Sequence, residues 1–394
     1  MVGLFVATSA TAQKRFDFAT DVDRPGWQRV APDTAYADAI GYGFEPDGGD
    51  GALFSVAIAE GDYRVTVWPA SSAPLTVWAE TRRLMRRATN APVQFTVNVR
   101  QPGLQPVPAN APGGSAVRLN AREQGSRSWD DRLTLGFHGP VARIEIEPVT
   151  ATRLILLGDS TVADQAGGDY ASWGQMLPRF LDDGVSVANH AESGETLKSF
   201  LTGLRLDKAL SQLRPGDVVL IQFGHNDSKA QWPQTYAEAG TTFRAYLRVY
   251  LEEVRRRGGS PVLVTSPHRR TFGADGRITN SHGGYPDAVR AVAREQSVPL
   301  IDLTMASARL YEALGAERAR LAFANEGNDA THHNAYGAYI LAAVIAEGLR
   351  DLDDPIAGHV TTDLHLLDLD NPPPPEQFDV RLIPARPIES PSGS

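Results

Sequence analysis

Five residues in four short polar clusters could carry out chemistry in this sequence. Ser160 lies in the first cluster, Gly194 in the second, Asn226 in the third, and Asp329 and His332 in the fourth. A serine hydroxyl is a weak nucleophile that needs a base within hydrogen-bond reach. His332 can be this base, and Asp329 can hold the tautomer of its ring and stabilise the imidazolium. The residue types therefore predict acyl transfer with Ser160, Asp329 and His332 as catalytic residues.

The same clusters contain donors for the negative charge that develops on the oxygen of a tetrahedral intermediate. We predict an oxyanion hole made by the backbone N–H groups of Ser160 and Gly194 and the side-chain amide of Asn226. Each donor is worth about 3 kcal/mol by comparison with a measured example. We expect Ser160 to begin a helix, whose dipole would favour the developing charge. His333, next to His332, is a competing candidate for the base.

The elements that position these clusters alternate between strands and helices. Continuous apolar runs predict strands that are buried on both faces, at residues 154–157, 185–188, 217–223, 261–265 and 298–302. Helical spacing of apolar residues lies between and after them, at residues 235–257, 285–296 and 333–349. This alternation predicts a parallel sheet covered on both faces, with functional residues at the carboxyl ends of its strands.

The preceding part of the chain has a different period. Short runs in which apolar and polar residues alternate lie between residues 14 and 148, and turn residues separate them. Such runs predict an all-β sandwich or barrel. We therefore expect a β half at residues 13–149, a catalytic half at residues 150–351, and a partly disordered C-terminal extension at residues 352–394.

The four arginines at residues 82–87 are predicted to form a solvated strand or turn face.

Composition restricts the functions that are possible. The net charge is −9 and no long run of Lys or Arg occurs, which argues against a nucleic-acid partner. The absence of cysteine excludes disulfides, thiolate catalysis and thiolate metal sites. No apolar stretch reaches the roughly 18 residues of a membrane-spanning helix.

Residues 1–12 end in Ala10-Thr11-Ala12, which has the small-x-small pattern of a signal-peptidase site. These residues are predicted to be a signal peptide remnant of a periplasmic or secreted protein.

The sequences of these clusters resemble the conserved blocks of the SGNH/GDSL hydrolase superfamily, and the resemblance covers roughly residues 153–350. Gly158-Asp159-Ser160 is similar to its first block, Gly194 to its second, Gly224-His225-Asn226-Asp227 to its third, and Asp329-x-x-His332 to its fifth. The resemblance implies a flavodoxin-like three-layer αβα hydrolase domain with a parallel sheet, preceded here by the all-β sandwich. It also implies an acyl-enzyme mechanism without a cofactor.

Within this superfamily the chain is most similar to the rhamnogalacturonan acetylesterase family, through residues 158–163, 197–200, 222–227, 267–270 and 329–332. This resemblance implies removal of O-acetyl groups from a pectic rhamnogalacturonan-like polysaccharide. One departure is Glu195, because members of the family often have Gly-Arg-Ser where this chain has Gly194-Glu195-Thr196. Residues 16–18, 41–44 and 129–133 of the β half resemble a galactose-binding-like sandwich.

Several further residues are candidates for binding the substrate. His268 and Arg269 open a long glycine-containing loop that could form a rim, and long loops of this kind are often functional. The other candidates are His225, Glu195, and two aromatic residues that could stack on a sugar, Trp173 and Tyr285. Packing in the core or at the rim is the alternative for these side chains. We predict no metal, since adjacent histidines such as His332 and His333 would project differently from a helix, and no obligate protein partner is evident.

Two other functions remain open at this point. A lipase, arylesterase or thioesterase would use the same catalytic residues on a different ester. A non-catalytic glycan-binding protein would keep the fold but lack activity.

Overall fold

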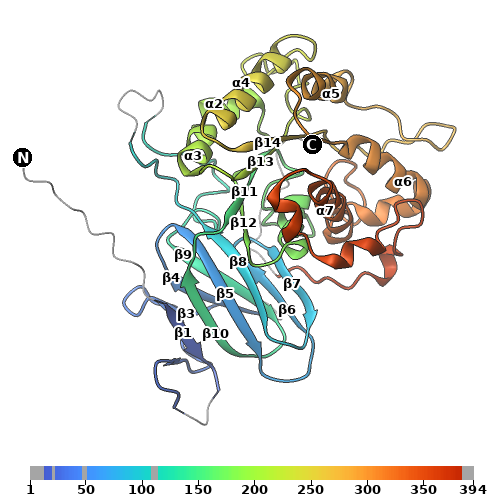
Figure 1. Cartoon of the computed structure of the whole chain (residues 1–394). Coiled ribbons are helices and arrows are strands. Elements are labelled where there is room, and N and C mark those ends of the chain that lie inside the picture. The colour runs from blue at the N-terminus through green and yellow to red at the C-terminus, as the bar shows by residue number, and fades with distance from the viewer. Residues whose placement is uncertain (1–12, 20–22, 47–50, 108–113, 384–394) are drawn as a thin grey trace, which may run out of the picture.

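The computed structural model describes residues 13–19, 23–46, 51–107 and 114–383 (Figure 1). The predicted signal peptide remnant at residues 1–12 lies outside the described residues. In the described part of the chain, no helix has both the length and the apolar character needed to cross a membrane.

The catalytic half is built on five parallel strands. They are β11 (Thr152–Gly158), β12 (Val185–Asn189), β13 (Val218–Gln222), β14 (Ser260–Val264) and β15 (Leu300–Ile301). Their order in the sheet is β15-β14-β13-β11-β12, which is the flavodoxin-like order. The strands contain mainly β-branched and leucine residues that are buried on both faces, as the continuous apolar runs predicted.

Helices cover both faces of this parallel sheet. Ile155 and Leu157 of β11 pack in one apolar cluster with α2 (Leu197–Thr202), α3 (Arg205–Gln212), α4 (Thr242–Arg256) and α5 (Tyr285–Gln296). Leu154 and Leu156 point to the other face and pack with α1 (Trp173–Met176), α6 (Leu303–Ala319) and α7 (Ala335–Arg350). The three-layer prediction is thus confirmed. The helix expected at residues 235–257 begins later, at Thr242.

The β half contains two sheets that pack against each other. One side consists of β5 (Gly61–Pro69), β8 (Val93–Val99), β10 (Val141–Pro148), β1 (Lys14–Asp17) and β2 (Gln28–Arg29). The other sheet consists of β3 (Tyr42–Glu45), β4 (Ala52–Ala57), β9 (Arg132–His138), β6 (Leu75–Ala79) and β7 (Arg83–Thr89). Side chains such as Val56 of β4 and Val65 of β5 fill the space between them.

The two halves share one sheet, which the sequence did not predict. Strand β8 of the β half pairs in parallel with β12 of the catalytic half, through Ser186 opposite Thr96 and Val187 opposite Val97. The result is a single ten-stranded sheet that runs from β15 to β2. Figure 1 shows β8 and β12 side by side where the halves meet.

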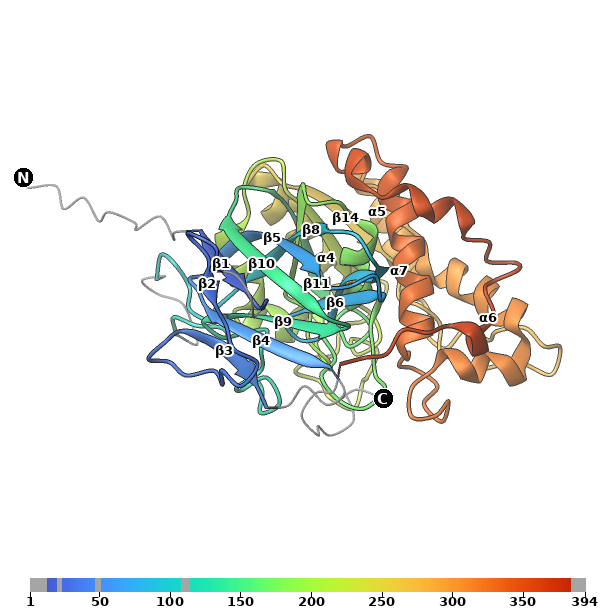
Figure 2. The same ribbon diagram turned by 90° about the horizontal axis from the view of Figure 1, so that it is seen from below.

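The chain after α7 returns to the β half (Figure 2). The side chain of Ile383 is 2% exposed, and its Cδ1 lies 2.0 Å from the position that a Cβ on Gly136 would take. The carbonyl of Ile383 accepts a hydrogen bond from Arg82 Nε at 2.6 Å. The C-terminal extension is therefore packed as far as Ile383, and the disorder expected near its end falls on residues 384–394, outside the described residues.

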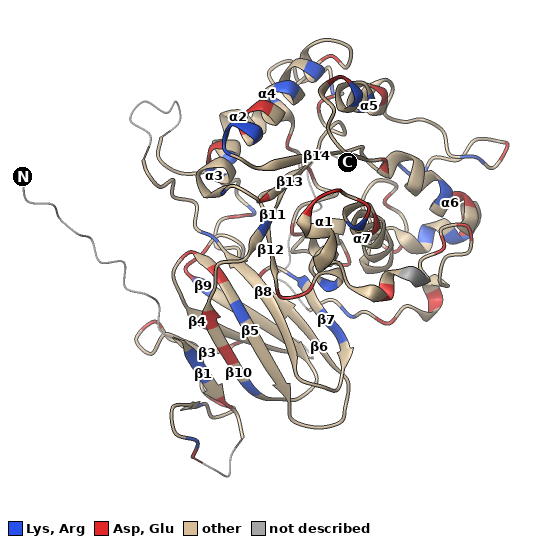
Figure 3. Ribbon diagram, in the orientation of Figure 1, with Lys and Arg blue, Asp and Glu red and all other residues tan. Residues whose placement is uncertain are grey.

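The prediction of a solvated arginine segment at residues 82–87 was wrong. Arg82 and Arg83 are 6% and 1% exposed, respectively. The guanidinium of Arg83 donates to Asp164 Oδ2 at 2.9 and 2.7 Å and to the carbonyl of Asn98 at 3.1 Å. Figure 3 shows this basic segment on β7, beside the helices of the catalytic half. The burial of Arg83 could not be predicted from the sequence, because its partner Asp164 lies 81 residues away along the chain.

Candidate active site

Ser160, His332 and Asp329 form a hydrogen-bonded triad. Ser160 Oγ lies 2.9 Å from His332 Nε2, and His332 Nδ1 lies 2.8 Å from Asp329 Oδ2. Since an ionised carboxylate can only accept, Nδ1 carries the ring proton and Nε2 accepts the proton of the serine hydroxyl. This tautomer is the one that a general base next to a serine nucleophile requires. Ser160 and His332 are 3% and 2% exposed, respectively, so bulk water is largely excluded from this contact.

Asp329 is held in its ionised form. Burial opposes its ionisation, but hydrogen bonds from the ring of His332 and from the backbone of His332 and Thr331 lower its pKa to about 2. The two backbone N–H groups donate to Oδ1 at 2.8 and 2.6 Å. A short turn therefore orients Asp329 before α7 begins, and its other oxygen is left for the histidine ring.

Ser160 lies in a turn at the carboxyl end of β11 and not at the start of a helix, so that expectation was wrong. The carbonyl of Asp159 accepts from the N–H groups of Val162 and Ala163, at 3.0 and 2.9 Å, and the chain then continues without helix until α1 at Trp173. Gln165 Nε2 donates to the carbonyl of Ser160 at 2.6 Å. These contacts fix the turn, and the helix dipole invoked for Ser160 does not apply.

Two backbone donors predicted for the oxyanion hole are available. In the described part of the chain, the N–H groups of Ser160 and Gly194 donate to no protein acceptor. Gly194 has φ 81°, a left-handed conformation that favours glycine. It lies in the oxyanion segment, which we define as Ser193–Glu195. Asn226 is 2% exposed, and its Nδ2 donates to the carbonyl of Glu195 at 3.2 Å, which ties the third predicted donor to the same segment.

Three of the predicted substrate-binding residues are buried and hydrogen-bonded within the protein. Trp173 is 1% exposed, and its Nε1 donates to Gln222 Oε1 at 2.8 Å. The hydroxyl of Tyr285 donates to the carbonyl of Ala237 at 2.7 Å, and its ring packs with the helices of the catalytic half. His225 is 1% exposed, with Nε2 3.0 Å from the carbonyl of Pro267. His225 comes soon after β13, whereas Trp173 and Tyr285 begin α1 and α5 and pack in the apolar clusters on the two faces of the sheet.

The other three candidates are partly exposed. Arg269 Nη1 lies 3.2 Å from His282 Nδ1 and also donates to the carbonyl of Ser281 at 3.2 Å. The ring of His268 stacks on His282, with centroids 5.8 Å apart. The structure thus brings His268 and Arg269 together at the rim loop, where their contact with a substrate stays a prediction.

The carboxylate of Glu195 is bound to two neighbouring side chains. Its Oε1 accepts from Arg205 Nε at 3.1 Å, and its Oε2 accepts from Ser199 Oγ at 2.5 Å. Burial raises the pKa of this carboxyl, although the charge of Arg205 opposes the shift. The negative charge of Glu195, which departs from the sequence typical of the family, is therefore paired with the guanidinium of Arg205 at the start of α3.

His333 does not compete for the role of base. Its Nε2 lies 2.6 Å from the hydroxyl of Tyr311, and burial lowers the pKa of its ring to about 3. It is 1% exposed, and the strand-like bridges to Ala171 and Phe323 hold its backbone. The two adjacent histidines therefore point in different directions, and in the described part of the chain no group of three or more potential ligands could hold a metal ion.

Sequence reasoning missed several residues around the triad. The ring of Tyr170 meets the ring of His332 edge to face at 5.8 Å. Arg270 donates through its backbone N–H to the carbonyl of Ala330 at 2.7 Å and through Nη2 to that of Gly327 at 2.9 Å, so it supports the Asp329 turn. Arg270 belongs to the segment 267–270 that resembles the family, whereas Tyr170 gave no signal because it lies in none of the resembling segments.

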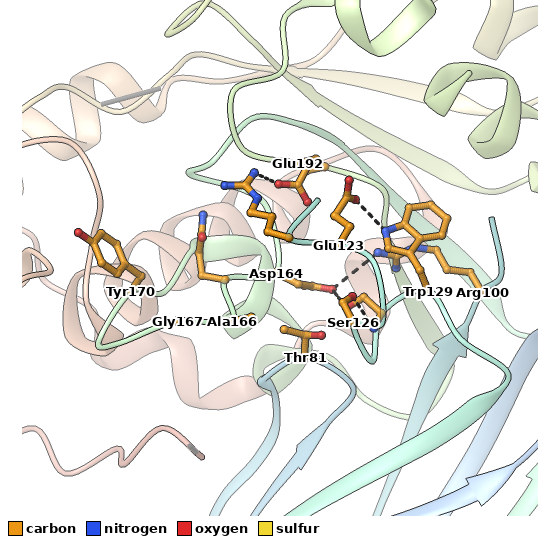
Figure 4. A pocket seen from close by; sticks show the side chains of 14 residues that line it. Thr81, Arg100, Glu123, Ser126, Trp129, Asp164, Ala166, Gly167, Tyr170 and Glu192 are labelled. Atoms are coloured by element: carbon orange, nitrogen blue, oxygen red, sulfur yellow. Dashed lines mark hydrogen bonds and ion pairs between the residues drawn. The ribbon is translucent and has the colours of Figure 1, made fainter. Parts of the chain in front are cut away.

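A polar pocket lies beside the triad, and both halves contribute to its walls. Residues 164–167, Tyr170 and residues 191–192 come from the catalytic half, whereas Thr81, Arg100 and residues of the loop 122–129 come from the β half. Figure 4 shows Tyr170 on one side of this pocket and Glu123, Trp129 and Arg100 on the opposite side. The β half therefore reaches the immediate surroundings of the active site.

Comparison with known proteins identifies the class of protein. Residues 156–340 match the GDSL-like lipase/acylhydrolase family. The chain is 38% identical over 223 residues to the rhamnogalacturonan acetylesterase RhgT of Bacillus subtilis. This alignment covers 53% of this chain and 94% of RhgT. The chain therefore belongs to the GDSL-like lipase/acylhydrolase family and is a serine ester hydrolase. The resemblance to the SGNH/GDSL superfamily is confirmed.

Other similarities extend over most of the chain. The uncharacterized esterase YxiM of Bacillus subtilis is 26% identical over 367 residues, or 85% of this chain and 90% of that relative. The crystal structure of the Bacillus subtilis YxiM protein aligns with a TM-score of 0.49 at 24% identity, covering 86% of this chain and 98% of that one.

Proposed function

We propose that this enzyme removes O-acetyl groups from an acetylated polysaccharide of the pectic rhamnogalacturonan type, and so takes part in pectin degradation. The observation that carries the proposal is the Ser160–His332–Asp329 triad, with its 2.9 and 2.8 Å contacts, in a chain 38% identical to a rhamnogalacturonan acetylesterase. Glu195 is bound to Arg205, so it presents no unpaired negative charge that would repel a uronate.

The geometry supports a two-step acyl transfer. Ser160 Oγ attacks the acetyl carbonyl while His332 Nε2 takes the hydroxyl proton. The negative charge on the carbonyl oxygen is stabilised by the N–H groups of Ser160 and Gly194, with Asn226 as the third donor. The bond from the acetyl carbon to the sugar oxygen then breaks while His332 gives the proton to that oxygen, so the sugar leaves with a free hydroxyl and an acetyl-enzyme remains. Water, deprotonated by the same histidine, attacks the acetyl-enzyme and releases acetate.

We further propose that the enzyme works in the periplasm or outside the cell. A polysaccharide is too large to cross a membrane intact, and Ala10-Thr11-Ala12 has the pattern of a signal-peptidase site. The test expresses the chain in a bacterial host with residues 1–12 extended at their N-terminus by the basic and apolar residues that a complete signal peptide needs, followed by fractionation and N-terminal sequencing. We expect a mature chain that begins near Gln13, and an uncleaved chain retained in the cytoplasm would contradict the proposal.

Acetate release from acetylated rhamnogalacturonan and from acetylated xylan is the decisive measurement. It should be made with the wild type, Ser160→Ala, and Ser72→Ala as a control at an exposed turn serine. We expect the wild type and Ser72→Ala to release acetate from rhamnogalacturonan, and Ser160→Ala to lose at least about 10⁴-fold in rate. Full activity of Ser160→Ala would overturn the mechanism.

A series of 4-nitrophenyl esters separates the alternatives. An acetylesterase loses activity as the acyl chain lengthens from acetate to octanoate, whereas a lipase or thioesterase gains activity. Binding of the polysaccharide without release of acetate, and without cleavage of any ester, would favour a non-catalytic glycan-binding protein.

A further inference from the structure

We propose that the β half positions the oxyanion hole, with Arg122 and Glu123 as positioning residues for Gly194. This inference rests on the proposed role of the Gly194 N–H as an oxyanion donor. The two residues lie next to each other in a loop of the β half, and each one anchors a different side of the oxyanion segment Ser193–Glu195.

Arg122 acts on the peptide group that contains the donor. Its Nη2 donates to the carbonyl of Ser193 at 3.0 Å, and its guanidinium also pairs with Glu192. The carbonyl of Ser193 and the N–H of Gly194 belong to the same planar peptide group, and in the trans form they point in opposite directions. An arginine that holds the carbonyl therefore sets the direction of the N–H. Its positive charge also polarises the peptide, which strengthens the donor.

Glu123 anchors the other side through Arg205. Its carboxylate accepts both terminal nitrogens of Arg205, with Nη1 at 2.9 Å, as well as Trp129 Nε1 at 3.0 Å. Arg205 in turn donates through Nε to Glu195 Oε1 at 3.1 Å. The side chains of Glu123 and Arg205 are 4% and 1% exposed, so solvent screens this pair little. The chain of contacts ends on the residue that follows Gly194.

A glycine in a left-handed conformation needs such supports. With φ at 81°, Gly194 has no side chain of its own to restrict its two peptide groups. The N–H of the second group, at Glu195, donates to the carbonyl of Glu192 at 3.3 Å, and the first group depends on the contact from Arg122. An oxyanion donor is effective only when it is already aimed at the position where charge develops. Anchoring Ser193 and Glu195 from the β half supplies this restriction.

The test compares Arg122→Met, Arg122→Lys and Glu123→Gln with the wild type on 4-nitrophenyl acetate. Removing one oxyanion donor costs about 10²–10³-fold in kcat, so a misdirected donor is expected to cost about ten-fold or more. KM should change less than about two-fold, and inactivation by a tetrahedral-forming phosphonate should slow in parallel with kcat. Arg122→Lys keeps the charge and is expected to recover part of kcat. Arg122 is 20% exposed, so its variants should fold even if Glu123→Gln does not.

Asp62→Asn is the matched control. Asp62 pairs with Arg153 at 2.8 Å across the same interface, but Arg153 lies near the amino end of β11, away from Ser160. This variant should lower the melting temperature with kcat unchanged. The proposal is overturned if Arg122→Met keeps the wild-type kcat, or if Asp62→Asn loses kcat to the same extent. Loss of activity in Ser160→Ala together with an unchanged kcat in Arg122→Met would refute the positioning role alone and leave the mechanism intact.

Discussion

The catalytic edge of the parallel sheet and the interface between the two halves both bury charged side chains, but they pair them over different distances along the chain. At the catalytic edge, Asp329 pairs with a histidine three residues later. At the interface, Arg83 pairs with Asp164, 81 residues away. The Asp329–His332 pair forms inside one turn, whereas the Arg83–Asp164 pair exists only after the halves have docked. In this protein, a local charge pattern therefore predicts a catalytic pair, but it does not predict the pair at the interface.

The largest effect should separate the two adjacent histidines at the catalytic edge. We expect His332→Ala to lose about 10⁴-fold or more in kcat, because the serine then lacks its base. His333→Phe should keep kcat within about ten-fold and should mainly lower the melting temperature, because it removes the contact with Tyr311. Steady-state kinetics with thermal melting of both variants makes the measurement. Equal losses of kcat would contradict the assignment of the base.

A charge removed at the interface should affect stability more than chemistry. Arg83→Met leaves the carboxylate of Asp164 buried without its strongest partner, and breaking a buried pair in this way costs about 3–5 kcal/mol. Urea unfolding should show this loss in the free energy of unfolding, and the double variant Arg83→Met/Asp164→Leu should regain part of it. A loss below about 1 kcal/mol for the single variant would contradict the cost expected for breaking this buried pair.

The pH dependence of stability sharpens the comparison, because Asp227 at the catalytic edge is buried and has no cationic partner among the residues that the structure describes. Burial, together with the negative charge of Asp159, raises its pKa from the ordinary 3.8 to about 7. A group whose pKa is higher in the folded state contributes stability below pH 4, and this contribution is lost as the pH rises through 7. The free energy of unfolding of the wild type should therefore fall relative to that of Asp227→Asn between pH 4 and 7. A constant difference in urea unfolding across this range would exclude the shift.

The smallest effect concerns an aromatic residue that the sequence placed in substrate binding. Tyr285→Phe should lose about 1 kcal/mol in the free energy of unfolding, because the hydroxyl no longer donates to the carbonyl of Ala237. KM for the acetylated polysaccharide should stay unchanged. A several-fold rise in KM without loss of stability would support the prediction that Tyr285 binds the substrate.

Most of the parallel sheet and the triad could be predicted, and the physical reason is the same for both. A strand buried on both faces leaves a continuous apolar run, and the polar residues that follow it must lie at the carboxyl edge, which is where Ser160, Gly194 and Asn226 are found. The burial of Trp173 was not predictable, because a lone tryptophan fits a core and a sugar site equally well.

The interface could not be predicted for a different reason. A segment with four arginines has the composition of a solvated surface, and only the folded chain brings Asp164 and the carbonyls of residues 167–168 to it. The dependence of the oxyanion segment on Arg122 was hidden in the same way, since its partner Ser193 lies 71 residues away.

The pairing of β8 with β12 has a consequence for anyone who wishes to shorten this protein. Cutting the chain near residue 150 would leave β12 as an edge strand, with the N–H and C=O groups that faced β8 unpaired on a strand that is otherwise buried. Exposed edges of this kind recruit other chains and lead to aggregation. A minimal esterase made from the catalytic half alone would therefore need a charged residue or a proline introduced on β12, and the two halves are better expressed, purified and engineered as one unit.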